Sequence, residues 1–116
     1  MAGNQLISSG RVKGTGVYGP DDAKVGQIET LMIEKVAGRV RYAVMSFGGF
    51  LGLGHSHYPI PWAALKYDPA VGGYRTGITE DQLKAAPENT GWDREWETRV
   101  HGHYGAPPYW AMGTPI

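Results

Sequence analysis

The stretch that decides the fold runs from Val25 to Phe47 and reads VGQIETLMIEKVAGRVRYAVMSF. In its first ten residues, Leu31 and Ile33 are two positions apart and would share one face of a β-strand. Ile28 is out of phase with them, and a β-bulge at residues 29–30 would restore the alternation. The first part of the stretch therefore predicts a strand that carries a bulge.

The second part of the stretch predicts a partner strand. Residues 35–38 have the composition of a hairpin loop, in which Gly38 would supply a positive φ. Residues 39–47 then place apolar side chains on both faces of a strand: Val40, Tyr42 and Val44 on one face, and Ala43, Met45 and Phe47 on the other. Two apolar faces indicate a strand that is covered on both sides.

Short strand and turn signals continue around this hairpin. The chain holds 18 glycines and 8 prolines in 116 residues, which favours a mainly β fold over a helical bundle. Pro59 and Pro61 place one strand at a sheet edge, and Thr79 with Gln82 forms a capping box that opens one short helix. We expect a helical turn at residues 61–65 and further short strands at residues 6–8, 17–18, 55–60, 66–68 and 74–76.

The last thirty residues differ in character and suggest a separate unit. Trp92, Trp96 and Val100 are spaced i, i+4 and i+8, as on one face of a helix that opens with a capping pattern at residues 90–93. Beyond residue 103 the chain is rich in glycine, proline and aromatic residues, and we expect it to be extended. We divide the chain into a domain at residues 5–86 and an aromatic extension at residues 87–116, which docks on its own domain or on a neighbour.

Charge and composition exclude several classes of protein. Eleven basic and eleven acidic residues cancel, so nucleic acid is an unlikely partner. The absence of cysteine excludes disulfides and zinc–thiolate sites. Residues 1–10 lack the pattern of a signal peptide, and the uncharged stretch at residues 42–65 contains too many glycines and prolines for a membrane span. We therefore expect a cytoplasmic, soluble protein.

Several of these motifs together resemble the PRC-barrel domain family. They are Val25-Gly26-x-Ile28-x-x-Leu31-x-Ile33, the Gly38 hairpin, Tyr42-Ala43-Val44, Phe47-Gly48-Gly49-Phe50-Leu51-Gly52 and Pro59-Ile60-Pro61-Trp62. The resemblance implies a small PRC-type β-barrel with one short helix, followed here by a helical or extended aromatic tail. The family includes the cytoplasmic domain of the photosynthetic reaction-centre H subunit and a domain of a ribosome maturation factor. Both serve as scaffolding or binding modules, and no catalytic residues define the family.

The candidate chemical motifs are weak. Gly14-x-Gly16-x-x-Gly19 matches a dinucleotide fingerprint, but Pro20 follows it and no helix pattern does, so we expect a turn and no cofactor. No serine or carboxylate pair has a catalytic setting, and we expect no enzymatic activity. On strands, the pairs His55/His57 and His101/His103 would each share one face as metal ligands do, but surface histidines explain them as well.

The residues most suited to binding a partner are aromatic and apolar. They lie in the glycine-rich loop and in the tail: Phe47, Phe50, Leu51, Trp92, Trp96, Tyr109 and Trp110. The leading hypothesis is a protein-interaction or assembly module, self-associating as a homodimer and linked by family analogy to photosynthetic or membrane complexes. The alternatives are an RNA-linked adaptor that uses Arg11, Lys13, Arg39 and Arg41, and a metal-binding regulatory protein.

Overall fold

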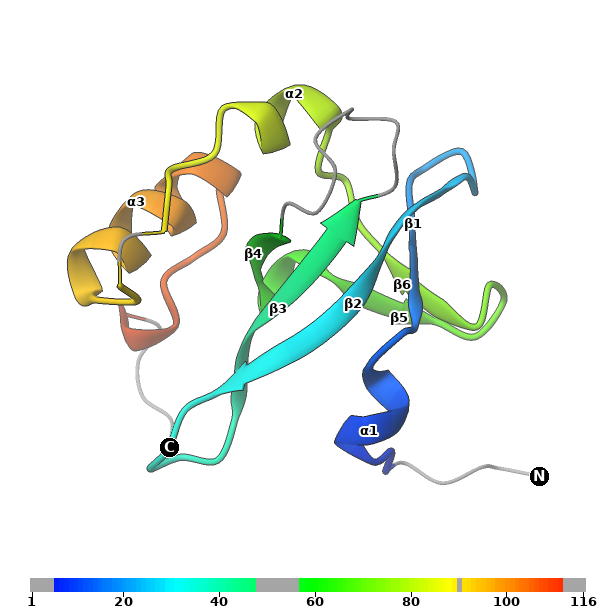
Figure 1. Cartoon of the computed structure of the whole chain (residues 1–116), viewed down its shortest axis with the longest axis horizontal. Coiled ribbons are helices and arrows are strands. Elements are labelled where there is room, and N and C mark those ends of the chain that lie inside the picture. Colours follow the sequence, from blue (N-terminus) through cyan, green and yellow to red (C-terminus); the bar gives the residue numbers. More distant parts are fainter. Residues whose placement is uncertain (1–5, 48–56, 90, 112–116) are drawn as a thin grey trace.

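The computed structural model describes residues 6–47, 57–89 and 91–111, and its centre is a six-stranded sheet (Figure 1). The strands follow the order β4-β3-β2-β1-β6-β5. All neighbouring pairs are antiparallel except β1 and β6, which are parallel, so the sheet is mixed. Their bounds are β1 Gly16–Tyr18, β2 Lys24–Ile33, β3 Val40–Phe47, β4 His57–Pro61, β5 Lys66–Asp68 and β6 Gly73–Arg75.

The central hairpin of β2 and β3 confirms the prediction from the sequence. The register of the two strands shifts between Ile28 and Thr30, where the alternation of apolar residues predicted a bulge. Gly38, in the connecting loop, has a φ of 70°, a left-handed conformation that glycine adopts without a steric penalty. Because the bulge brings Ile28 into phase with the inner face, its side chain is fully buried.

The ladder does not close into a barrel. Among the described strands, β4 and β5 stand at the two ends of the hydrogen-bonded order and are not paired with each other. Pro59 and Pro61 in β4 are two positions apart and have no N–H group, so β4 lacks two donors on one of its edges. The mainly β class is confirmed, while the sheet is open over the residues that the structure describes.

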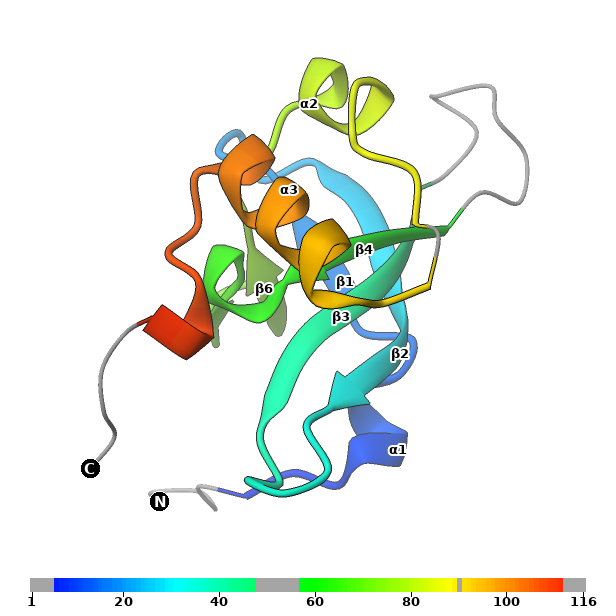
Figure 2. The same cartoon turned by 90° about the vertical axis from the view of Figure 1, so that its left-hand side faces the viewer.

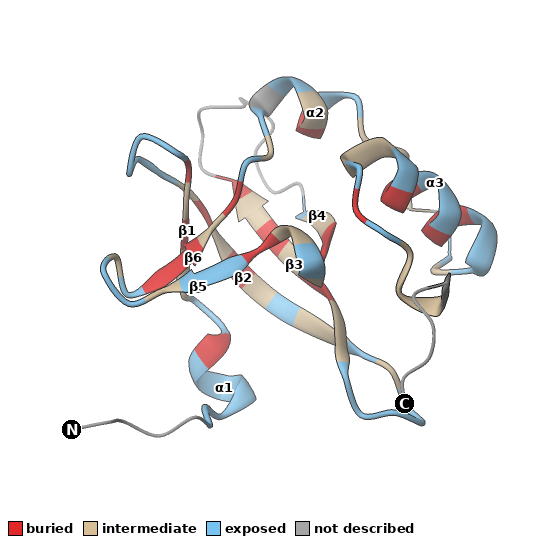
Figure 3. Cartoon of the chain, turned by 180° about the vertical axis from the view of Figure 1, so that it is seen from behind, coloured by how far each residue is buried: buried red, intermediate tan, exposed pale blue. Residues whose placement is uncertain are grey.

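Two apolar clusters lie on opposite faces of β3. Ala43, Met45 and Phe47 belong to the larger cluster, which the curved sheet encloses together with side chains from β1, β4 and β6. Tyr42 points the other way and packs with Trp96 and Val100 of the C-terminal helix. The buried residues of both clusters appear in red in Figure 3. The prediction that β3 is covered on both sides is therefore confirmed.

Short helices connect and flank the strands. The capping box is present as predicted: the Thr79 hydroxyl accepts from the Gln82 N–H, and the Gln82 side chain accepts from the Thr79 N–H. The predicted strand at residues 6–8 is wrong, because the Ser8 hydroxyl accepts from the N–H of Arg11 and starts a helix. The helices are α1 Ser9–Val12, η2 Trp62–Ala64, α2 Glu80–Lys84, α3 Arg94–Tyr104 and η3 Tyr109–Ala111.

Helix α3 begins later than the sequence pattern indicated. The Asp93 carboxylate accepts from the N–H of Trp96 and caps the helix, whereas Thr90 lies outside the described residues. Trp92 precedes the helix with a φ of 62°, so it is not part of a helical stripe. Its ring nevertheless packs edge-on against Trp96, with the ring centroids 4.9 Å apart. Figure 2 shows α3 lying across β3 and β4.

Arg75 in β6 links the turn between β1 and β2 to the end of β5. Arg75 donates from Nε to Asp68 at 2.5 Å and from a terminal nitrogen to Asp22 at 2.6 Å. Asp22 belongs to the turn between β1 and β2, and Asp68 ends β5. The guanidinium group therefore links segments that are 46 positions apart in the sequence.

No helix in the described parts of the chain combines the length and apolar character needed to cross a membrane.

Candidate functional site

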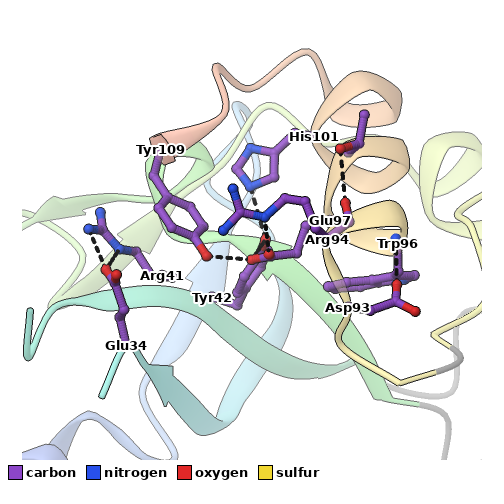
Figure 4. Close-up of polar contacts among 10 residues, drawn as sticks. Glu34, Arg41, Tyr42, Asp93, Arg94, Trp96, Glu97, His101 and Tyr109 are labelled. Carbon is purple, nitrogen blue, oxygen red and sulfur yellow. Dashed lines mark hydrogen bonds and ion pairs between the residues drawn. The ribbon is translucent and has the colours of Figure 1, made fainter. Parts of the chain in front are cut away.

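The carboxylate of Glu97 is the centre of a polar cluster between α3 and the sheet (Figure 4). The Tyr42 hydroxyl donates to Oε2 of Glu97 at 2.7 Å, and the Tyr109 hydroxyl donates to the same oxygen at 2.6 Å. Arg94 donates from Nε to Oε1 at 3.0 Å. We call Tyr42, Arg94, Glu97, His101 and Tyr109 the Glu97 cluster. It joins β3, α3 and η3, and it fixes the C-terminal segment to its own sheet.

His101 completes the cluster through contacts of both ring nitrogens. Its Nδ1 lies 3.2 Å from the backbone carbonyl oxygen of Ala106, which can only accept, so Nδ1 carries a hydrogen. Its Nε2 lies 3.1 Å from the Tyr42 hydroxyl, whose single hydrogen is also directed to Glu97. His101 therefore contacts both the loop after α3 and the hydroxyl group that binds Glu97.

Burial makes this cluster energetically important. Tyr42 is 2% exposed, His101 is 3% exposed and Glu97 is 7% exposed. Desolvation, followed by the hydrogen bond to Glu97, raises the pKa of Tyr42 far above its ordinary value. The same two causes raise the pKa of Tyr109 to about 12. Both phenols therefore stay protonated and act as donors near neutral pH, as a buried carboxylate requires.

Local structure positions the aromatic residues around the cluster. The Asn89 side chain accepts from the N–H groups of Gly91 and Trp92, which holds the turn that leads into α3. The Trp92 and Trp96 rings both pack against Tyr42, with centroid distances of 5.6 and 5.4 Å. At the other end of the helix, Gly105 adopts a left-handed conformation that lets the chain turn back towards η3.

Two arginines extend the cluster to the surface. The Cζ atom of Arg41 lies 4.2 Å from the centroid of the Tyr109 ring, and Cζ of Arg94 lies 3.9 Å from that of Trp110. Arg41 also pairs with Glu34, at 2.6 Å. A cavity of 140 Å³ opens beside these groups, lined in part by Arg41, Trp92 and Tyr109. We call Arg41, Trp92, Arg94, Tyr109 and Trp110 the aromatic–arginine face.

The structure separates the partner-binding residues that the sequence suggested. Phe47 is buried in the sheet core, where it packs edge-on against Tyr58, and Phe50 and Leu51 lie outside the described residues. Trp96, a residue of α3, is fully buried against Tyr42 of the sheet. The other three tail residues are half-buried and lie together on the aromatic–arginine face: Trp92, Tyr109 and Trp110.

Sequence reasoning missed the polar centre of this site. Glu97 and His101 are four positions apart, directly after Trp96 and Val100. Such i, i+4 pairs share a helix side, and a polar pair adjoining an apolar stripe is the signal that could have identified them. Arg41 was considered as a nucleic-acid contact, but in the structure its guanidinium is engaged by Glu34 and Tyr109.

The two histidine pairs do not form a metal site within the described residues. His101 and His103 lie on a helix, where positions i and i+2 point in different directions, so the strand geometry we considered does not apply. His103 contacts the backbone oxygen of Gln82 at 2.6 Å. His57 is exposed at the start of β4, and His55 lies outside the described residues. No group of three or more metal-binding side chains occurs in the parts that the structure describes.

The match to a known family covers the sheet and ends before α3. The family model for the PRC-barrel domain matches residues 5–83, which is most of the chain and spans all six strands. A search of curated proteins gave no match. The match ends before α3, so the Glu97 cluster joins a residue of the matched region, Tyr42, to side chains beyond it. The chain belongs to the PRC-barrel domain family.

Proposed function

We propose that this chain is a non-enzymatic protein-interaction module that assembles protein complexes, including complexes of its own copies. Membership of the PRC-barrel family supports an interaction role. A place in photosynthetic or other membrane-linked assemblies, in the cytoplasm, is suggested by family analogy alone.

The aromatic–arginine face is the observation that carries this proposal. Tyrosine, tryptophan and arginine are the residues most enriched among the energetic hot spots of protein interfaces. On this face the Tyr109 and Trp110 rings pack edge to face, and Arg41 and Arg94 lie over them, so little side-chain entropy would be lost on binding. The Glu97 carboxylate beneath them accepts hydrogen bonds from Tyr109 and Arg94 and so fixes both side chains in position.

The chemistry of the Glu97 cluster favours a structural role over a catalytic one. Both carboxylate oxygens already accept hydrogen bonds, and the Tyr42 hydroxyl beside them is buried. A general acid or base must reach a substrate proton, directly or through one water molecule. These groups are buried and already hydrogen-bonded to one another, which suits the structural role of holding α3 on the sheet.

Capture of binding proteins tests the proposal. The 116-residue chain is immobilised, exposed to a lysate of the source cells, and compared with a variant that carries Arg41→Ala and Trp110→Ala. We expect proteins that the wild type retains and the variant loses. The matched control is Val36→Ala, which shortens a side chain that is 96% exposed on the β2–β3 loop. Circular dichroism verifies that each protein is folded.

A set of retained proteins that is identical for the wild type, the control and the face variant would argue against binding through this face. Loss of the same proteins from the Val36→Ala variant would show that the effect is not specific to the face.

A further inference from the structure

Three of the exposed large apolar residues surround a single hollow. Leu6 is 87% exposed, Ile7 is 57% exposed and Tyr67 is 55% exposed. The hollow between them has a volume of 880 Å³, and its walls also include Ser8, Arg11, Pro69 and Tyr74. Scattered apolar residues are normal on a protein surface, but a group of them around one hollow marks an interaction site.

This hollow adjoins an open edge of the sheet. Strand β5 stands at the end of the strand order, and among the described strands it pairs with β6 alone. The outer edge of a terminal strand presents backbone N–H and C=O groups that can pair with another strand. The apolar hollow and the strand edge meet at Tyr67, so one partner can engage both.

The charges on β5 would be complementary in an antiparallel pair of two such strands. Lys66 and Asp68 flank Tyr67, and the register of the hairpin places Lys66 opposite Arg75, a residue of like charge. In an antiparallel pairing of two β5 strands centred on Tyr67, each Lys66 would stand opposite Asp68 of the other copy, whose carboxylate also pairs with Arg75 of its own chain and would then lie between two cations. Directly opposed charges of unlike sign stabilise a sheet, and those of like sign destabilise it. The strand is therefore self-complementary about a two-fold axis.

We propose that β5 pairs antiparallel with β5 of a second copy, with Tyr67 on the two-fold axis and the Leu6–Ile7 segments of both copies burying one another. A ladder of three residues per strand is too short to hold two chains together. The apolar residues around the hollow supply the rest of the interface, because they lie on the same side as Tyr67. The inference rests on the self-association proposed above and names its surface.

Charge and apolar variants of the full chain test this interface by sedimentation equilibrium. Lys66→Glu would place like charges opposite each other twice per dimer, and we expect the dimer dissociation constant to rise about tenfold or more. Leu6→Asp would put a charge into the apolar contact, and we expect the dimer to be lost. Both side chains are exposed in the single chain, so folding should be unaffected. The matched controls, Lys35→Glu and Val36→Asp, change exposed residues of the β2–β3 loop and should leave the dimer intact.

Disulfide trapping gives a second measurement that depends on position. The chain has no cysteine, so Tyr67→Cys introduces a single thiol. Opposed residues of an antiparallel pair have Cβ atoms about 5 Å apart, which is close to the spacing a disulfide needs. We expect Tyr67→Cys to form a covalent dimer on mild oxidation about tenfold faster than Val36→Cys does, and Lys66→Glu in the same chain to slow it.

The outcomes separate this inference from the proposal on which it rests. A dimer that is unchanged by Lys66→Glu and Leu6→Asp, or trapping no faster than for Val36→Cys, would overturn pairing through β5 while self-association through another surface stands. A chain that is monomeric at every concentration would overturn both the interface and self-association. Capture of other proteins by the aromatic–arginine face is measured independently of either result.

Discussion

At the scale of single residues, the molecule depends on one buried carboxylate. Glu97 accepts hydrogen bonds from Tyr42, Arg94 and Tyr109, which come from a strand, its own helix and the last helical turn. A buried charge is costly unless it is fully paired, and here both oxygens are engaged. Removing one donor should therefore lower the free energy of unfolding by more than the loss of an ordinary hydrogen bond does.

The first prediction concerns the donor from the sheet. Tyr42→Phe removes the hydroxyl that binds Glu97 and His101 while keeping the ring between its aromatic neighbours. We expect the free energy of unfolding to fall by about 2 kcal/mol, because the lost bond is to a charged acceptor. Urea denaturation measures it. Tyr18→Phe is the control, since the Tyr18 hydroxyl has no hydrogen bond within the described residues, and an equal loss in both variants would contradict the role of the cluster.

The second prediction concerns acid. The hydrogen bond and charge of Arg75, together with the N–H of Ala70, hold the pKa of Asp68 below its ordinary range. A lowered pKa in the folded state means that the stabilisation is complete above the unfolded pKa, about 3.9, and is lost as the pH falls through the folded value. We expect Asp68→Asn to destabilise the protein at pH 7, and the difference from wild type to shrink below about pH 4.

Thermal unfolding as a function of pH measures that difference. Asp81→Asn, at an exposed position in α2, is the control and should show no comparable trend. A difference in unfolding temperature between wild type and Asp68→Asn that stays constant from pH 7 to pH 3 would contradict the ion pair between Asp68 and Arg75.

The third prediction concerns alkali. Desolvation raises the pKa of Tyr42, Tyr104 and Tyr109 above the ordinary value of about 10. A raised pKa in the folded state means that the stabilisation is present below pH 10 and is lost as the pH rises through the folded value. Absorbance titration at the phenolate band should show part of the seven tyrosines ionising near pH 10 and the remainder only above it or on unfolding. Ionisation of all seven in one step near pH 10 would contradict the burial.

At the scale of elements, two glycines should respond to alanine in opposite directions. A Cβ on Gly26 in β2 would collide with the backbone oxygen of Ser46, whereas one on Gly102 in α3 would meet nothing within 4 Å. We expect Gly26→Ala to destabilise the protein by about 2 kcal/mol and Gly102→Ala to stabilise it by up to about 1 kcal/mol. Chemical denaturation of both variants tests this pair, and the same sign for both would contradict it.

Local signals predicted most of the elements well. The bulge between Ile28 and Thr30, the Gly38 turn and the Thr79 capping box each depend on neighbouring residues, so the sequence contains what is needed to predict them. The prediction of a strand at residues 6–8 was wrong because Ser8 caps a helix. A short apolar run does not by itself distinguish a strand from the start of a helix. Closure of the sheet could not be predicted, because it depends on how distant strands meet.

The candidate site was only partly predictable for the same reason. The tail aromatics were identified as a group; Trp92 and Tyr109 line one cavity, and Trp110 packs against Tyr109. Their common centre, however, is a carboxylate joined to a tyrosine 55 positions away. A contact over that distance has no local signature, and a single glutamate in a helix usually reads as a solvated side chain.

At the scale of the whole molecule, the sheet and the C-terminal segment form one structure with two candidate contact surfaces. The aromatic–arginine face lies on the C-terminal segment and β3, and the β5 edge lies at the other end of the strand order from β4. Different residues form each surface, so a partner at one does not compete for the residues of the other. We infer a module that can link its own copies and still bind another protein.

The solution mass of the chain, measured by light scattering over a wide concentration range, tests the proposed self-association most directly. We expect the mass to rise with concentration from the 12.6 kDa of one chain to twice that value. We also expect Trp110→Ala to leave this rise intact and Lys66→Glu to shift it to higher concentration. A constant mass of 12.6 kDa at all concentrations would contradict the assembly role proposed here.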